Sequence, residues 1–520
     1  MSGSAATADI KLTWREWLGF MSMVLGMFMA ILDIQIVSAS IAEIQAGLSA
    51  SSDEVSKVQT SYLIAEIVMI PLSGWLSRLL STRVLFTISA VGFTIFSLAC
   101  AMATTLPVMV IFRACQGFIG GAMIPTVFAT SFLLFPGAKR AQISVLIGLT
   151  ATLAPTIGPT LGGWLTQEFN WHWLFLINVP VGALVAFNVW TFLDIDKANP
   201  GLAKSFDAIG LFLMAAFLGS LEYVLEEGNR NDWFADDLVF DLGIVTVVAG
   251  VLFFWRMLSR PQPLVDLKAF TDANFAFGCL FSFVVGIGLY GSVYVIPLFL
   301  GRVRGFDSLE IGETMFVTGL TMFIAAPISG RLSRRMDMRI MLAGGLLGFG
   351  IAVFWLAHLT NQSSFWEMLA PQSLRGGAMM FIMLPVNQLA LGTLPPMQLK
   401  NASGLYNLMR NLGGAIGLAL INTVATAREA VHTLHLNEQV TWARAGVTNY
   451  LSMMTQGFQP AMQGSAKLGA LKQISLMVER ESLTQTYNDV FLLMALTFLL
   501  AIPLTLLLRN PRGVGPSDAH

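Results

Sequence analysis

The stretch PLSGWLSR, Pro71–Arg78, recurs in the second half of the 520-residue chain as PISGRLSR, Pro327–Arg334. An arginine follows each copy after the same interval, at Arg83 and Arg339. Each copy also ends an apolar segment that is long enough to span a membrane. Chance reuse of ordinary helix-end residues does not explain why the spacing, the trailing arginine and the place in each half all agree. We interpret the repeat as the sign of two related halves.

Composition indicates that lipid surrounds most of the chain. Hydrophobic residues make up 55% of it and charged residues 12%, against about 25% charged residues in soluble domains. The apolar runs are continuous and not alternating, which favours helices over a β-barrel. We therefore expect an all-α polytopic membrane protein. Fourteen spans are expected, at 17–41, 56–77, 84–104, 107–134, 142–166, 173–193, 207–226, 238–258, 274–300, 310–330, 340–359, 366–393, 402–426 and 488–508.

Positive charge predicts the orientation of these spans. Lys and Arg are concentrated in the short connections on the side that holds the N-terminus, and such connections face the cytoplasm. Both termini are therefore expected to be cytoplasmic. The run 17–41 is longer than the ~7–15-residue core of a signal peptide, so we expect it to be retained as the first span. Both copies of the repeat then turn at the cytoplasmic face, and parallel halves of this kind are typical of transporters.

Several function classes are excluded by what the sequence lacks. Cys100, Cys115 and Cys279 all lie in apolar runs, where thiols behave as small hydrophobic groups, so we expect neither a disulfide nor a metal site. No glycine-rich phosphate loop occurs, which argues against ATP as an energy source within this chain. The net charge of -1 gives no reason to expect nucleic acid. No cluster typical of an enzyme is found, so no catalytic residue and no cofactor are expected.

Three charged residues deep in the predicted spans are the main candidates for function. Asp33 lies in the first span, Glu66 in the second and Arg113 in the fourth, where a charge costs about 2.5–3.5 kcal/mol on insertion scales. Low dielectric favours the protonated form of a carboxyl group, and a nearby arginine favours the charged form. Asp33, modulated by Arg113, could therefore load and release a proton; the alternative is a static ion pair that joins helices. Glu66 could be a second proton site, a contact for a cationic substrate or a residue that faces a wet cavity.

Other charges within the spans are harder to assign. Glu222 lies near a helix end, and extension of its side chain to the membrane interface accounts for it. Arg375 and Arg410 are less easily explained in this way. Arg410 could meet an anion or neutralise a helix C-terminus.

Glycines occur at matching places in the fifth and thirteenth spans. They are Gly158, Gly162 and Gly163 in the fifth, and Gly413, Gly414 and Gly417 in the thirteenth. Small residues at this spacing let helix backbones approach closely. Plain packing explains them, and helices packed in this way can also rock, as alternating access requires.

Five stretches of the chain resemble motifs of one known family. They are LDIQIVSASI (Leu32–Ile41), FRACQGFIGGAMIP (Phe112–Pro125), LAPTIGPTLGGWL (Leu153–Leu165), WHWLFLINVPVG (Trp171–Gly182) and LPPMQLKNASGLYNLMRNLGGAIG (Leu394–Gly417). Together they resemble the fourteen-span drug:proton antiporters of the major facilitator superfamily, the EmrB/QacA type, and most closely its EmrB-like members. The likeness runs from about residue 15 to 510. The combination is specific, although any single motif would not be.

The resemblance implies the major facilitator fold, with two six-helix bundles and two inserted helices that should be peripheral. The implied parts are a cytoplasmic N-terminus (1–16), an N-terminal bundle (17–193), a linker with the two inserted helices (194–273), a C-terminal bundle that includes a long periplasmic loop at 427–487 (274–508), and a cytoplasmic tail (509–520). The repeated stretch becomes the cytoplasmic gating loop of each bundle. This chain has Ser77 where the general motif has Asp, so the usual latch cannot simply be transferred. We expect Asp337 in the second copy to supply a substitute carboxylate.

The resemblance and the residues together give four sets of candidate site residues. The proton-coupling set is Asp33, Glu66 and Arg113, and Glu66 departs from the neutral residue typical of EmrB-like members. The antiporter motif is Gly158, Pro159, Gly162 and Gly163. The gating loops are Gly74, Arg78, Arg83, Gly330, Arg334, Asp337 and Arg339. The cavity-lining set is Gln116, Asn178, Tyr290, Tyr294, Asn387, Asn407 and Arg410.

The function expected is proton-driven export of hydrophobic or amphipathic toxic compounds across the bacterial inner membrane. The energy source would be the proton gradient. The long loop at 427–487 is either a solvated surface or, as we favour, a contact for a periplasmic membrane-fusion protein (EmrA-like) that leads to an outer-membrane channel (TolC-like). The first alternative is an exporter dedicated to one physiological solute, such as a fatty acid, siderophore or peptide. Import or symport is disfavoured by the fifth-span glycine motif.

Overall fold

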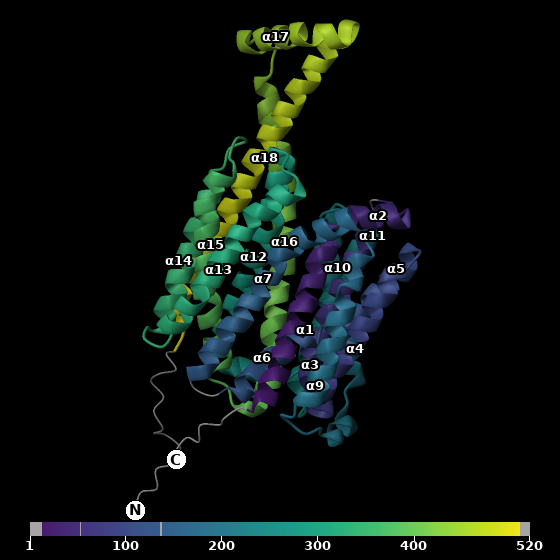
Figure 1. Ribbon diagram of the computed structural model, residues 1–520, viewed down its shortest axis with the longest axis vertical. Coiled ribbons are helices and arrows are strands. Elements are labelled where there is room, and N and C mark those ends of the chain that lie inside the picture. Colours follow the sequence, from purple (N-terminus) through teal and green to yellow (C-terminus); the bar gives the residue numbers. More distant parts are fainter. Residues whose placement is uncertain (1–12, 52–53, 136–137, 510–520) are drawn as a thin grey trace, which may run out of the picture.

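The computed structural model describes residues 13–51, 54–135 and 138–509 (Figure 1). The regular elements in these residues are all helical. Fourteen helical stretches among the described residues are long and apolar enough to cross a membrane. The all-α class and the number of spans are therefore confirmed. Most of the predicted cytoplasmic end segments, 1–12 and 510–520, lie outside the described residues.

The N-terminal half supplies the first six of these stretches. Its helices are α1 (Trp14–Ala39), α2 (Ile41–Leu48), α3 (Lys57–Leu80), α4 (Thr82–Ala101), α5 (Leu106–Gly120), α6 (Met123–Leu134), α7 (Ala138–Glu168), α8 (Trp173–Leu176) and α9 (Asn178–Phe192). The span expected at 107–134 is divided into α5 and α6, because the helix is interrupted between Gly120 and Met123. A connection follows with η1 (Pro200–Ser205), α10 (Ala208–Glu227), η2 (Trp233–Ala235), α11 (Asp237–Ser259) and η3 (Leu267–Thr271).

The C-terminal half supplies the last six stretches. Its elements are α12 (Ala273–Leu298), η4 (Phe299–Arg304), α13 (Ser308–Leu332), α14 (Met338–Leu356), α15 (Phe365–Leu391), α16 (Pro396–Gln439), α17 (Ala445–Met462), η5 (Gln463–Ser465), α18 (Ala466–Ala501) and η6 (Ile502–Leu507). Polar caps fix several of the helix starts. Thr13 and Glu16 form a capping box at the start of α1, and the Asp272 carboxylate accepts from the Phe275 amide at 2.8 Å at the start of α12.

The two halves pack as separate groups of helices that meet along a central seam (Figure 1). In the first half, α1 packs against α7 and α9, and α3 packs against α5. In the second half, α12 packs against α16, and α15 packs against α13 and α14. The seam is formed by α7 against α13 and by α3 and α6 against α16. We call the end of the molecule where α1 begins the proximal end, and the end that carries α17 the distal end.

Glycines hold α7 against α1 and α16 against α12, as their matching positions predicted. A Cβ atom on Gly162 of α7 would lie 2.9 Å from the Ile36 carbonyl oxygen of α1. A Cβ atom on Gly413 of α16 would lie 2.1 Å from the Phe283 carbonyl oxygen of α12. Any side chain at these positions would push the backbones apart. The two halves therefore repeat the same close helix contact.

The inserted helices α10 and α11 differ in their surroundings. They pack against each other, and α11 leaves large apolar side chains such as Val247 and Trp255 exposed. In contrast, α10 also packs against α3 and α16, one helix from each half. Our expectation of a peripheral pair fits α11, whereas α10 reaches the central seam.

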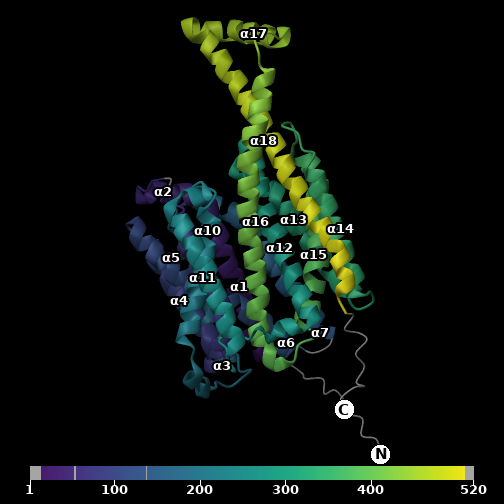
Figure 2. The same ribbon diagram turned by 180° about the vertical axis from the view of Figure 1, so that it is seen from behind.

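The segment 427–487 is mostly helical and not an irregular loop. Helix α16 continues to Gln439 and has 44 residues, and α18 starts at Ala466 and has 36 residues, about twice the ~20 residues that cross a bilayer. Their ends project together from the bundle, and α17 lies across them and packs on α18 (Figures 1 and 2). Sequence hydropathy missed this extension because its helical residues mix polar and apolar side chains and form no continuous apolar run.

Candidate functional site

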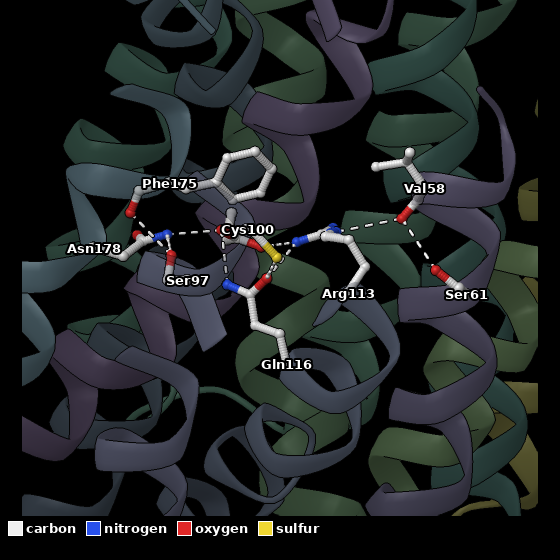
Figure 3. Close-up of polar contacts among 9 residues, drawn as sticks. Val58, Ser61, Ser97, Cys100, Arg113, Gln116, Phe175 and Asn178 are labelled. Atoms are coloured by element: carbon white, nitrogen blue, oxygen red, sulfur yellow. Dashed lines mark hydrogen bonds and ion pairs between the residues drawn. The ribbon is translucent and has the colours of Figure 1, made fainter. Parts of the chain in front are cut away.

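Asp33 of α1 lies at the centre of a buried polar cluster in the N-terminal half. Arg113 of α5 donates from Nη1 to Asp33 Oδ2 at 2.6 Å, and neither side chain has any exposed surface. Asn178 of α9 donates to Asp33 Oδ1 at 2.7 Å, and Gln116 of α5 donates to the same oxygen at 3.3 Å. Figure 3 shows the side chains of Arg113, Gln116 and Asn178 converging in this cluster. The carboxylate therefore joins three helices, and its charge is met by one arginine.

The surroundings of Arg113 come from α3 and from its own helix. Its Nε donates to the Val58 carbonyl oxygen at 3.3 Å, and its Nη1 also donates to Gln116 Oε1 at 2.8 Å (Figure 3). The guanidinium lies 4.2 Å from the centre of the Tyr62 ring, which gives a cation–π contact. Its Nη2 is buried and has no hydrogen-bond partner among the described residues. A proton on Asp33 would remove the one charge partner that Arg113 has in this cluster.

Gln116 and Asn178 were predicted to line a cavity, but this structure places both within the Asp33 cluster. Both are buried and both bind Asp33. Asn178 also donates to Ser97 Oγ at 3.1 Å, and Ser97 donates to the Phe175 carbonyl oxygen at 2.9 Å (Figure 3). Both residues lie in the stretches that resemble family motifs, but the sequence does not show which side of a helix faces the cavity.

A cavity of about 580 Å³ lies between the two halves. This volume falls in the range of about 300–1,000 Å³ found for sites that bind drug-sized ligands. Its lining includes Ile34 and Gln35 of α1, Glu66 of α3, Pro159 and Gly163 of α7, Tyr290 and Tyr294 of α12, and Asn411 and Asn422 of α16. The cavity therefore touches α1 beside Asp33, whereas Asp33 itself points into the N-terminal half.

The structure places some of the predicted site residues at this cavity and others away from it. Glu66, Tyr290 and Tyr294 line it, as do two residues of the antiporter motif. Glu66 is 2% exposed. Asn387 and Asn407, which were also predicted to line a cavity, are buried outside its wall in this structure. Asn387 accepts from the Tyr406 hydroxyl.

Arg410 does not line the cavity either, contrary to the prediction. It donates from Nη2 to Asn407 Oδ1 at 2.6 Å, and its guanidinium lies 5.3 Å from the centre of the Phe128 ring of α6. Its Nε and Nη1 are buried without hydrogen-bond partners among the described residues. Arg375 of α15 donates from Nη2 to Thr318 Oγ1 at 2.9 Å.

Two cavity residues on the inserted helix α10 were missed. Glu222 and Glu226 both line the cavity. Glu222 is 4% exposed, so extension to the membrane interface does not explain it. The spacing of the two carboxylates, one helical turn apart, was visible in the sequence. We did not assign them to the cavity because we expected α10 to be peripheral.

The repeated stretches lie at the proximal ends of α3 and α13. Arg339 pairs with Asp337 of the same loop, with Nη2 at 2.8 Å from Oδ2. Arg83 lies 5.4 Å from the centre of the Trp190 ring. Arg78 is half-buried and Arg334 is exposed.

Contacts across the seam close the proximal end of the cavity. A Cβ atom on Gly74 would lie 2.7 Å from the Lys400 carbonyl oxygen, so α3 and α16 touch at the first repeat. Lys400 Nζ donates to the Ser77 carbonyl oxygen at 3.0 Å and forms an ion pair with Asp196. On the opposite side of the seam, a Cβ atom on Gly330 would lie 3.3 Å from Val145 of α7. We expected Asp337 to replace the missing loop carboxylate, but the carboxylate that meets Lys400 across the halves is Asp196.

Comparison with known proteins gives the same family as the motifs. Residues 23–418 match the model of the Major Facilitator Superfamily. The chain belongs to the major facilitator superfamily. It is 44% identical over 502 residues to the colistin resistance protein EmrB of Acinetobacter baumannii, covering 96% of this chain and 98% of that protein. It is 31% identical over 500 residues to the multidrug export protein EmrB of Escherichia coli K12, covering 94% and 95%.

The fold of the superfamily is confirmed by a solved structure. The human organic anion transporter MFSD10 matches with a TM-score of 0.54 at 15% identity, over 93% of this chain and 99% of that one. The chain is therefore a multi-pass membrane transporter of the major facilitator superfamily and not an enzyme. The resemblance to EmrB-like members that the motifs indicated is also confirmed.

Proposed function

We propose that this chain is a drug:proton antiporter of the bacterial inner membrane, and that Asp33 is its proton carrier. The observation that carries the proposal is the fully buried Asp33–Arg113 ion pair, which joins α1 to α5 next to the cavity. Breaking a buried pair is costly because it leaves a charge without a partner. A proton on Asp33 therefore changes the energy of the contacts that α1 makes with α5 and α9.

The coupling follows from where α1 lies. One face of α1 carries Asp33, and the next residues, Ile34 and Gln35, line the cavity. The same helix packs on α7 through Gly158 and Gly162. A change at Asp33 can therefore alter both the cavity wall and the α1–α7 contact. This is the link that an antiporter needs, since only a difference between two states can be driven by a proton.

The closed proximal end supports an outward-open state. With the proximal end in the cytoplasm, α3 and α16 close the cytoplasmic side at Gly74 and Lys400. The cavity is lined by residues from the distal parts of its helices, such as Ser38, Gln59 and Asn422. An exported compound would leave on this side.

The names of the relatives support drugs as substrates. The relatives are called a colistin resistance protein and a multidrug export protein. The cavity has the volume of a drug-sized site and mixes apolar side chains with tyrosines and amides. Hydrophobic and amphipathic toxic compounds fit this lining.

The helical extension supports a tripartite assembly. Helices α16 and α18 project from the distal end, and α17 packs across α18 (Figure 2). Both helices run well beyond the ~20 residues that cross a bilayer, so their ends form an ordered surface outside the membrane on which a partner can dock. We infer that it contacts a periplasmic membrane-fusion protein that leads to an outer-membrane channel. Replacing residues 440–465 with a short linker should leave transport in vesicles intact and abolish drug resistance in cells that contain both partners.

Proton antiport in everted vesicles tests the main proposal. A pH-gradient dye reports whether adding a lipophilic drug releases protons from energised vesicles. The wild-type protein should give this signal, and Asp33→Asn should lose it while inserting at wild-type levels. No response to any drug from folded wild-type protein would refute the proposal.

A further inference from the structure

The cavity has an acidic end that the Asp33 site does not explain. Among the described residues that line it, four are carboxylates, and none is Lys, Arg or His. The four are Glu43, Glu66, Glu222 and Glu226. Two of them, Glu222 and Glu226, come from α10, a helix outside the two six-helix halves.

One oxygen of the Glu222 carboxylate, Oε2, is buried without a hydrogen-bond partner among the described residues. The residue is 4% exposed. Glu226, one helical turn further along α10, and Glu66 of α3 line the same cavity and are also carboxylates. The neighbouring Glu227 differs, because it accepts from the Thr60 hydroxyl at 2.9 Å and lies 3.9 Å from Arg230. A buried carboxylate that lacks a partner is costly to keep charged, so a cation in the cavity would stabilise it.

The rest of the cavity fits an organic cation with an apolar body. Tyr290 and Tyr294 are one helical turn apart on α12, and both line the cavity. Tyrosine rings attract cations through their faces. Apolar residues such as Leu63, Ile67 and Val293 supply the rest of the wall. The site thus offers negative charge at α10 and α3 and an apolar surface beside it.

We propose that Glu222 and Glu226 of α10 recognise the positive charge of an amphipathic organic cation, and that this class of compound is the preferred occupant of the cavity. The inserted helix α10 is then part of the substrate site and sets charge selectivity. The inference deepens the proposed function, because it names the substrate class of the same cavity. It does not depend on Asp33 or on proton coupling.

Two probes of equal shape and opposite charge test the inference. Tetraphenylphosphonium and tetraphenylborate carry the same four phenyl groups, with one positive and one negative charge. Equilibrium binding to the purified full-length chain in detergent is measured without any gradient, after subtracting binding to empty micelles. The wild-type protein should bind the phosphonium at least about tenfold more tightly than the borate, as expected when selectivity is electrostatic.

Matched variants of α10 show which of its carboxylates cause the preference for the phosphonium. Glu222→Gln and Glu226→Gln should each weaken phosphonium binding, Glu222→Gln by about tenfold, and leave borate binding unchanged or stronger. Glu227→Gln removes the same charge beside the cavity residues and should leave phosphonium binding unchanged. If Glu222→Gln does not fold, Glu226→Gln still decides, because Glu226 is half-buried.

The outcomes separate this inference from the proposed function. Equal binding of the two probes, or unchanged phosphonium binding in both Gln variants, would overturn the inference even if drug-driven proton release is found. Selective binding that is lost in the α10 variants would support it even if no proton release is seen, in which case the antiporter proposal fails alone.

Discussion

Asp33 Oδ2 lies 2.6 Å from Arg113 Nη1, in an ion pair that has no contact with solvent. The pair also receives hydrogen bonds from Asn178 and Gln116. A carboxylate in this position is held by donors from two other helices, so we expect a change in its protonation state to alter how α1, α5 and α9 pack together. We therefore expect Asp33 to link proton binding to movement of α1.

Removing the arginine should destabilise the protein. Arg113→Gln leaves a buried carboxylate without its charge partner, and we expect a loss of about 3–5 kcal/mol in the free energy of unfolding. Chemical or thermal unfolding in detergent measures the loss. The double variant Asp33→Asn, Arg113→Gln should recover part of it, because both charges are absent. An Arg113→Gln protein as stable as wild type would show that the pair is not held as described.

The close contact of α7 with α1 should be needed for transport. A Cβ atom on Gly158 would lie 2.4 Å from Gln35 Cβ, whereas a Cβ atom on Gly148 of the same helix would lie 3.5 Å from Met383 Cβ, an ordinary contact. Gly158→Ala should therefore reduce the transport rate strongly, and Gly148→Ala should leave it near wild type. Both are compared in vesicles at matched protein levels. Equal activity of the two variants would argue against this contact as a moving part.

The Lys400–Asp196 ion pair should help to keep the proximal end closed. Ser403 lies in α16 near this contact and is 1% exposed. In a background in which the three native cysteines are replaced by alanine, Ser403→Cys should resist a water-soluble maleimide. Adding Lys400→Ala should raise the labelling rate several-fold, because it removes the bonds to Asp196 and the Ser77 carbonyl. Lys204→Ala, which removes an exposed lysine of η1, is added instead in the control protein. Equal labelling in the Lys400→Ala and control proteins would show that Lys400 does not hold this end.

Much of the fold could be predicted from the sequence, because lipid restricts a spanning chain to continuous apolar helices. The same constraint made Asp33 and Arg113 visible, since each is a costly charge within an apolar run. Hydropathy carries no such signal outside the membrane, so the long ends of α16 and α18 were expected as a loop.

Contacts between segments that are distant in the chain could not be predicted from the sequence in the same way. Gln116 and Asn178 were assigned to the cavity because polarity does not show which way a side chain points. Glu222 was assigned to the membrane interface because its closeness to a helix end had a simpler explanation. The pairing of Lys400 with Asp196 depends on how the two halves pack together, and no short sequence pattern predicts that packing.

The most direct test of proton coupling at Asp33 separates exchange from accumulation. Purified wild-type and Asp33→Asn proteins are reconstituted in liposomes with a drug that the vesicle assay has identified. Wild type should exchange the drug at equilibrium and should also accumulate it against its gradient when a pH gradient is imposed. Asp33→Asn should retain the exchange and lose the accumulation. An Asp33→Asn protein that still accumulates the drug under the pH gradient would contradict the account.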